Sequence, residues 1–465
     1  MGKSPFLEGN FAPVEREVEE DDLAVIGALP RDLAGTYVRN GPNPQLPPSG
    51  QYHWFDGDGM LHAVRFAGGR ASYRNRWVRT RGFELERKRG RALWTGLLER
   101  RQFDNPEGAV KNTANGGLAC FAGKLLALHE QGEPYEIALP GLETKGAFTA
   151  NRRLRHPLAP HPKLDPATGE LYAVGYSPIA KPHLQYSIFA ADGALVHTTA
   201  VELPIGVLVH DFALTERFAV FMNHPYTYDV RRWLRGEPIA RFEPERGSFL
   251  GLLPRRASGS EVRWYPVAPC FVYHTVNAWD DGEQVVLDVF HRWALDLPGD
   301  LAPRAAPDQL SQLWRWRIDP RGGAVREEPL DERNADLPSL HPARVGKRAR
   351  WAFASRLRSD VRQPIADALL KYDLHGPANP VIHAFGPDRF GGEGSFVPRP
   401  GAEAEDDGWL LAFVHDEKEG ASELLVIDAR DLAAPPLARI QLPQRVPFGL
   451  HGVFSPDVRG ESPAR

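Results

Sequence analysis

Short strand-like runs recur along the whole chain and constrain its fold more than any other feature. Several runs alternate apolar and polar residues, the period-two pattern of a half-buried strand. Others are continuously apolar, as in the inner strands of a packed sheet. Together they predict an all-β fold. The clearest runs are residues 124–129, 171–176, 218–222, 285–290, 313–318, 409–414 and 423–428.

Turn residues separate these runs. Asp and Gly, in places with Pro, stand at residues 165–169, 192–193, 281–282, 319–323 and 407–408. The chain has 465 residues with 44 Gly and 42 Pro, which is enough for many such turns. Many strand pairs joined by Asp/Gly turns, without exposed sheet edges, favour the radial repetition of a β-propeller over a sandwich. Because no WD-like or kelch-like repeat is present, the pattern leaves the number of blades open.

Two segments interrupt the strand pattern. We expect them to be cap insertions, around residues 82–115 and 225–260, in a single domain that spans residues 1–465. Residues 82–103 show a short helical pattern of leucines among Arg and Glu. Residues 225–253 carry aromatic and aliphatic side chains among arginines. Two interpretations of this second segment stay open: a lid packed over one face, or an apolar patch that makes peripheral contact with a membrane.

Charge and cysteine content exclude several classes of protein. The formal net charge is −4 and the pI is about 6.5, so no basic field would attract nucleic acid. The first residues hold no apolar run typical of a signal peptide, and no apolar stretch approaches the length of a membrane span, so we expect a cytoplasmic location.

Cys120 and Cys270 form neither a disulfide framework nor a metal motif. The Gly-Asp-Gly at residues 57–59 does not open a βαβ unit, so no dinucleotide site is predicted. Nothing indicates the oligomeric state.

Two compact clusters near the N-terminus flank one aromatic segment. The first reads RNGPNP at residues 39–44, and the second reads WFDGDGM at residues 54–60. Glycines with positive φ, fixed prolines and Asx hydrogen bonds would make both of them turns. On this interpretation Asp56 and Asp58 form turns and do not bind a metal.

The two clusters together resemble the N-terminal signature of the carotenoid cleavage oxygenases. This family of non-haem iron enzymes includes bacterial apocarotenoid oxygenases, lignostilbene dioxygenases and retinal pigment epithelial membrane protein. Four later segments are similar to further motifs of the family, in the same order. They read APHPKLDPATGE, VLVHDF, FVYHTVNA and VPFGLHG, and they contain His161, His210, His274 and His451.

The resemblance implies a seven-bladed β-propeller with a helical and loop cap over its iron-bearing face. It implies that His161, His210, His274 and His451 bind one Fe(II) per chain. None of the 16 histidines forms a closely spaced ligand pair, as expected if each inner strand supplies one ligand. Neutral imidazoles suit ferrous iron. The signature would close the first blade and place Trp54 and Phe55 near the iron-bearing face.

Three carboxylates would orient the ligand rings by accepting from their second N–H groups. By resemblance these are Glu130, Glu393 and Asp336. The family has a glutamate where this chain has Asp336, and aspartate is one methylene shorter. We therefore expect either a strand that lies closer to the ring or an intervening water.

Two positions of the implied site bear on the substrate. Lignostilbene-type relatives carry a lysine that holds a phenol where this chain has His129, and their partner tyrosine has no match around Gly96. These two departures favour a polyene such as an apocarotenoid over a phenolic stilbene. Family members commonly have a threonine, which shields one open coordination position, where this chain has Gly116; with glycine we expect that position to be more open to water or oriented differently, which bears on the O2 geometry.

The implied activity is cleavage of a C=C bond of a carotenoid or apocarotenoid by O2 into two carbonyl products, with no further redox cofactor. One alternative is the cleavage of a lignostilbene or another phenylpropanoid alkene. An alternative of a different class is a non-catalytic propeller scaffold, which would need exposed aromatic binding residues and no buried metal.

Overall fold

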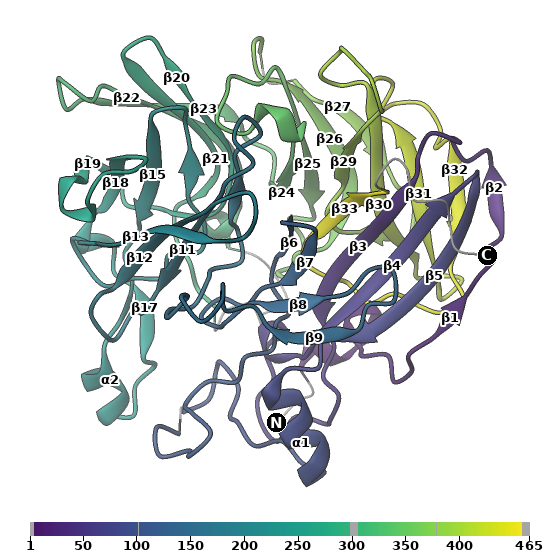
Figure 1. Cartoon of the computed structure of the whole chain (residues 1–465), viewed down its shortest axis with the longest axis horizontal. Helices are drawn as coiled ribbons and strands as arrows, with labels where there is room; N and C mark the ends of the chain where they lie inside the picture. Colours follow the sequence, from purple (N-terminus) through teal and green to yellow (C-terminus); the bar gives the residue numbers. More distant parts are fainter. Residues whose placement is uncertain (1–3, 101, 298–305, 378, 458–465) are drawn as a thin grey trace.

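The strands of the computed structural model form seven blades arranged in a ring (Figure 1), and the structure describes residues 4–100, 102–297, 306–377 and 379–457. The first three blades are built from the N-terminal part of the chain. Blade 1 comprises β3 (Gly35–Pro42), β4 (Gly59–Ala67) and β5 (Arg70–Trp77), with the short β1 (Glu19–Glu20) on its outer edge. Blade 2 comprises β6 (Leu118–Phe121), β7 (Lys124–Ala127), β8 (Tyr135–Ile137) and β9 (Thr144–Ala147). Blade 3 comprises β10 (Lys163–Leu164), β11 (Leu171–Tyr176), β12 (Leu184–Phe189) and β13 (Leu195–Val201).

The remaining blades follow in chain order. Blade 4 comprises β14 (Ala213–Leu214), β15 (Phe218–Asn223), β18 (Ser248–Pro254) and β19 (Arg263–Val267). Blade 5 comprises β20 (Phe271–Asp281), β21 (Gln284–Arg292), β22 (Gln312–Ile318) and β23 (Val325–Asp331). Blade 6 comprises β24 (Ala335–Ser339), β25 (Trp351–Leu357), β26 (Ala366–Asp373) and β27 (Val381–Ala384). Blade 7 comprises β29 (Ser395–Pro398), β30 (Gly408–Asp416), β31 (Ala421–Asp428) and β32 (Ala438–Gln441), with β2 (Val25–Gly27) outside it.

The two ends of the chain close the ring. The C-terminal β33 (Gly452–Pro456) pairs antiparallel with β3, with Val453 opposite Val38, and becomes the innermost strand of blade 1 (Figure 1). Blades 6 and 7 are also joined, because β28 (Arg389–Gly391) pairs with both β26 and β30. The all-β propeller and the predicted strand runs are confirmed, and each predicted Asp/Gly turn lies between two strands.

The N-terminal signature lies where blade 1 begins, but it does not have the expected backbone. Residues 39–42 lie within β3, and Gly41, Gly57 and Gly59 all lack positive φ, so the predicted left-handed turns are wrong. These glycines are needed because the backbone packs closely there. A Cβ on Gly41 would lie 2.7 Å from the Cα of Gly449, and a Cβ on Gly59 would lie 2.5 Å from the carbonyl oxygen of Ala114.

The first insertion contains α1 (Arg81–Arg89). The Thr80 hydroxyl caps its first turn by accepting from the Phe83 N–H at 3.1 Å, and Gly90 ends the helix at φ 66°. The leucine pattern up to residue 103 therefore predicted too long a helix. Short 3-10 segments occur elsewhere: η1 (Pro5–Leu7), η2 (Gly9–Phe11), η3 (Trp54–Asp56), η5 (Gly259–Glu261), η7 (Pro307–Gln309) and η8 (Pro342–Arg344).

The second insertion is shorter than expected. It holds β16 (Tyr226–Tyr228), α2 (Val230–Leu234), β17 (Ala240–Phe242) and η4 (Pro244–Arg246), and the chain rejoins blade 4 at β18. Several apolar residues of the segment are covered: Leu250 and Leu252 lie in the core, and the Trp233 ring packs edge-on against Phe103 at 4.9 Å. Val230 and Leu234 are exposed. No helix in the described ranges has the length and apolar character to cross a membrane.

Two buried histidines lie between blades 4 and 5. Their burial predicts that the folded state becomes less stable in acid. His224 contacts the Ser248 hydroxyl, and His291 stacks on Trp314 at 4.6 Å. The Nε2 atom of His224 and both ring nitrogens of His291 have no hydrogen-bond partner among the described residues. Burial lowers the pKa of His224 to about 3 and that of His291 to about 4. Both rings are therefore neutral in the folded state.

The folded state should lose stability as the pH falls from about 6.5 toward 4, because only the unfolded chain then takes up protons at these rings. For His291 the loss is about 3 kcal/mol at pH 4. Urea unfolding at several pH values will measure it, and H291F should flatten the dependence. H375F, at an exposed histidine, should leave the slope unchanged. An equal slope for H291F and the unaltered chain would contradict the prediction.

Candidate metal centre

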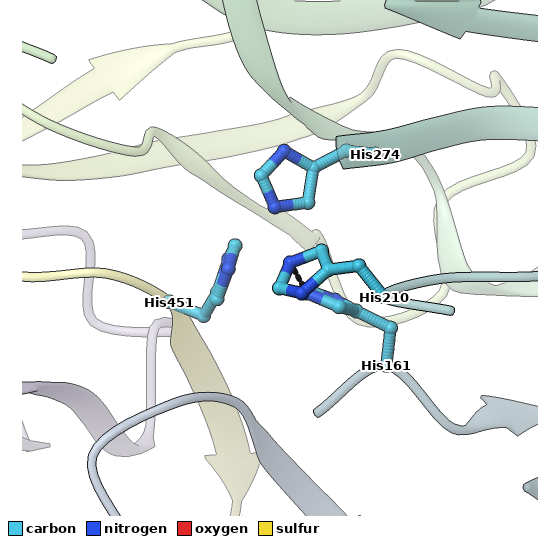
Figure 2. Close-up of side chains that lie close together, drawn as sticks. All are labelled: His161, His210, His274 and His451. Carbon is cyan, nitrogen blue, oxygen red and sulfur yellow. Dashed lines mark hydrogen bonds between the residues drawn. The ribbon is translucent and has the colours of Figure 1, made fainter. Parts of the chain in front are cut away.

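Four histidines from four blades lie close together (Figure 2). His161 precedes β10, His210 precedes β14, His274 lies in β20, and His451 immediately precedes β33. Each of these elements is the innermost strand of its blade, so residues that are distant in sequence meet at one point. One ring nitrogen from each histidine lies within 4.8 Å of the others, and the Nε2 atoms of His161 and His210 are 3.0 Å apart.

Three carboxylates fix the orientation of three of the rings. In each pair a histidine Nδ1–H donates to a carboxylate oxygen at 2.7 Å. This bond leaves the Nε2 lone pair of each ring available toward the centre. The pairs are His210 with Glu130, His274 with Asp336 and His451 with Glu393.

The shorter Asp336 reaches its ring as closely as the two glutamates reach theirs. The contact to His274 is direct, so the water considered as one alternative is not needed. The backbone supplies the missing length, because the pairing of β24 with β25 shifts register after Asp336, and Leu337 adopts φ 58°. The Leu337 N–H donates back to the same carboxylate oxygen at 2.9 Å.

The four-histidine cluster has the donor set expected of a divalent metal site. The buried Nε2 of His274 has no hydrogen-bond partner among the described residues. Burial and the three neighbouring imidazoles hold the pKa of His161 well below its ordinary value, so this ring is neutral. Burial also lowers the pKa of His274, although Asp336 opposes the shift. Neutral imidazoles with converging lone pairs suit a borderline divalent ion such as Fe(II).

His210 differs from the other buried rings in its titration. Burial disfavours the charged ring, but the Glu130 carboxylate at 2.7 Å prevails and raises the pKa of His210. A bound cation would favour the neutral ring, because protonation of Nε2 and coordination through Nε2 exclude each other.

A cavity of about 320 Å³ reaches the cluster and is lined by three of its histidines, His210, His274 and His451. Aromatic side chains make up much of its wall, and they include Trp54 and Phe55 of the signature, as expected. The other aromatic lining residues include Phe6, Tyr52, Trp94, Tyr228 and Tyr273. A cavity of this kind suits an apolar ligand.

The predicted pocket residues Gly116, His129 and Glu130 all line this cavity. The Nδ1 atom of His129 accepts from the Gln131 N–H at 3.2 Å. A Cβ added to Gly116 would lie 3.2 Å from both the carbonyl oxygen of Leu128 and the Cβ of Pro160, so a larger side chain would need a small shift of its neighbours.

The two aspartates of the signature have different roles. Asp56 accepts from the backbone N–H of His53, which is the local kind of hydrogen bond that was predicted, and also from the N–H of Leu97, which lies in the first insertion. Asp58 instead pairs with the buried Lys111 at 2.5 Å, and the same ammonium lies 2.6 Å from Glu86 of α1. This ion triad holds the first insertion against the signature, and no sequence pattern indicated it.

Comparison with known proteins supports the family that the sequence motifs indicated. Residues 11–456 match the family described as retinal pigment epithelial membrane protein. The chain is 34% identical to carotenoid 9,10(9',10')-cleavage dioxygenase 1 of Arabidopsis thaliana, over 97% of this chain and 89% of that protein. The chain belongs to the carotenoid cleavage oxygenase family. It is an alkene-cleaving dioxygenase of that family with a four-histidine site.

Two further relatives show how wide the family is. This carotenoid cleavage oxygenase is 33% identical to isoeugenol monooxygenase of Pseudomonas nitroreducens, over 97% of this chain and 98% of that protein. It is similar to the crystal structure of Pseudomonas brassicacearum lignostilbene dioxygenase, with a TM-score of 0.90 and 31% identity, over 98% of this chain and 100% of that one. The names of these relatives span different substrates, so the family alone does not give the substrate.

Proposed function

We propose that this oxygenase binds one Fe(II) through His161, His210, His274 and His451 and cleaves a C=C bond of an apocarotenoid into two carbonyl products. The observation that carries the proposal is the set of four imidazoles with converging nitrogen atoms at the end of an aromatic cavity. Bound ferrous iron would supply the activation of O2 toward an electron-rich alkene.

The residues of this chain would orient the reactants. Glu130, Asp336 and Glu393 hold three rings at fixed angles, so the ligand set is formed before a metal binds. The aromatic wall would exclude water and hold a flat conjugated chain beside the cluster. Gly116 leaves more space in the cavity than the threonine that is common in the family.

The proposed substrate class rests on the side chains that a phenolic substrate would meet in the cavity. His129 lines the cavity where lignostilbene-type relatives have a lysine. An imidazole is a weaker partner for a phenolate than the ammonium group of a lysine. Around Gly96 the cavity is lined by Ala92, Trp94, Thr95, Leu97 and Glu99, none of them a tyrosine. A polyene without a phenol would need neither group.

Phenolic alkene cleavage is the second candidate, because the fold is so similar to that of a lignostilbene dioxygenase. Incubation with β-apo-carotenals, hydroxystilbenes and isoeugenol, followed by identification of the carbonyl products, separates the two candidates. We expect cleavage of the apocarotenals, and H129K should raise activity on hydroxystilbenes. Cleavage of only the phenolic alkenes would overturn the proposed substrate class.

A non-catalytic scaffold is the third candidate and predicts no metal. Metal analysis of the purified chain, before and after reconstitution with ferrous iron under anaerobic conditions, distinguishes it from the enzyme. About one iron per chain is expected. A chain that neither contains iron nor takes it up would contradict the proposed function.

A further inference from the structure

Three carboxylates hold the ligand rings, and among the described residues a cationic side chain contacts only that of Asp336. Its second oxygen accepts from the Arg292 guanidinium at 3.3 Å and from the Ser311 hydroxyl at 2.9 Å. The second oxygen of Glu130 accepts from the Tyr176 hydroxyl, and that of Glu393 from the Ser395 hydroxyl, both neutral groups.

Arg292 connects two of the four histidines. It ends β21, its side chain is 14% exposed, and it lines the cavity. Through Asp336 it reaches His274. Its guanidinium also lies over the Tyr273 ring at 4.8 Å, and that ring packs edge-on against His210 at 5.2 Å. Its Nε is buried without a hydrogen-bond partner among the described residues, so the guanidinium depends on Asp336 for charge pairing.

The charge around the cluster is set by three carboxylates and the cations near them. Glu130, Asp336 and Glu393 carry three negative charges, and Arg292 offsets the one on Asp336 by direct contact. The buried Arg39 also acts electrostatically on Glu393, but it forms no ion pair with that carboxylate among the described residues. Lys163 is nearby but pairs with Asp211 at 2.7 Å, so it leaves this balance unchanged. In a buried site an uncompensated charge is costly, and an extra negative charge favours the higher oxidation state of a metal.

We propose that Arg292 is a positioning residue that holds Asp336 and sets the charge of the metal site, so that the ferrous state is favoured over the ferric state. This inference rests on the proposed function, because it assumes iron at the four histidines. The effect is electrostatic and is exerted through Asp336. Ser311 and the Leu337 N–H continue to hold the carboxylate when the arginine is removed, so metal should still bind.

The test compares R292Q, R292M and R292K with the unaltered chain after anaerobic loading with ferrous iron. R358Q is the matched control, because Arg358 also lines the cavity but pairs with Asp360. The readouts are iron content, the ferric/ferrous reduction potential from a spectroscopic redox titration, and the ferric signal in electron paramagnetic resonance after exposure to air. None of them requires substrate.

We expect about one iron per chain in every variant. The potential should fall in R292Q and R292M, with a shift in the ferric/ferrous equilibrium of roughly tenfold or more, the size expected for one nearby unit charge at an effective dielectric constant of about 20. R292K and R358Q should keep the original potential, because both keep the positive charge beside Asp336.

Unchanged potentials in R292Q and R292M, with iron bound, would overturn the inference and leave the proposed function intact. Loss of iron in both variants would show that Arg292 is needed for binding and would also overturn its assignment as the residue that sets the potential. Failure of the unaltered chain to bind iron would instead contradict the proposed function. Because R292M keeps the length of the side chain without its charge, it reports on charge if R292Q fails to fold.

Discussion

Replacing His161 with alanine should leave the protein folded, without iron, and at least about a thousandfold slower in turnover, since a metal centre supplies several kcal/mol of transition-state stabilisation. The His161 ring contacts the rings of all three other cluster histidines, at centroid distances of 4.5 to 4.9 Å. The carboxylates that orient the other rings keep their partners in this variant, so the loss would report on the missing ligand.

Metal analysis and product formation measure the effect of H161A. H375A is the control, because that histidine is exposed and outside the cluster, and it should keep both iron and activity. Thermal unfolding of H161A should stay cooperative. Full iron content and turnover in H161A would show that the four histidines are not the metal site.

Replacing Gly59 with alanine should destabilise the protein by about 3 kcal/mol, at the upper end of what overpacking a well-packed site costs. The added Cβ would lie 2.5 Å from the carbonyl oxygen of Ala114 and 2.8 Å from that of Thr113. Both are backbone atoms, and the Gly59 N–H already donates to the Thr113 carbonyl at 2.8 Å, so neither β4 nor the segment at Thr113 can move freely.

Urea unfolding will measure the change, with G376A as the control. A Cβ on Gly376 meets no atom within 4 Å, and its φ is not in the left-handed region, so the substitution should be close to neutral. A G59A protein as stable as G376A would contradict the explanation that the signature glycines permit close backbone packing.

The strands and turns could be predicted because they depend on local sequence. The continuous apolar run at residues 171–176 coincides with β11, which is buried along its whole length, and the Asp/Gly turn at 281–282 joins β20 to β21. The number of blades could not be derived in this way, because β33 completes blade 1 from the other end of the chain. The prediction of left-handed turns in the N-terminal signature is wrong for a related reason. Glycine serves both for positive φ and for close packing, and only the tertiary structure distinguishes the two.

The site was predicted only in part. Resemblance to the family placed His161 and the other ligands, whereas their spacing along the chain could not, because each comes from a different blade. The contact of Asp336 with His274 depends on a register shift in β24, and no residue pattern predicts that shift. Arg292 and Lys111 were missed because their partners are distant in sequence and a single basic residue has no distinctive motif.

Isotope labelling of the two carbonyl products tests the central claim most directly. A single turnover under ¹⁸O2, with rapid chemical reduction to prevent exchange of the aldehydes with water, followed by mass spectrometry, gives the origin of each oxygen atom. A dioxygenase with one iron site predicts one ¹⁸O atom in each of the two products, and none after the same reaction in H2¹⁸O under ordinary O2. Label from O2 in only one product, with the other oxygen taken from water, would contradict the account.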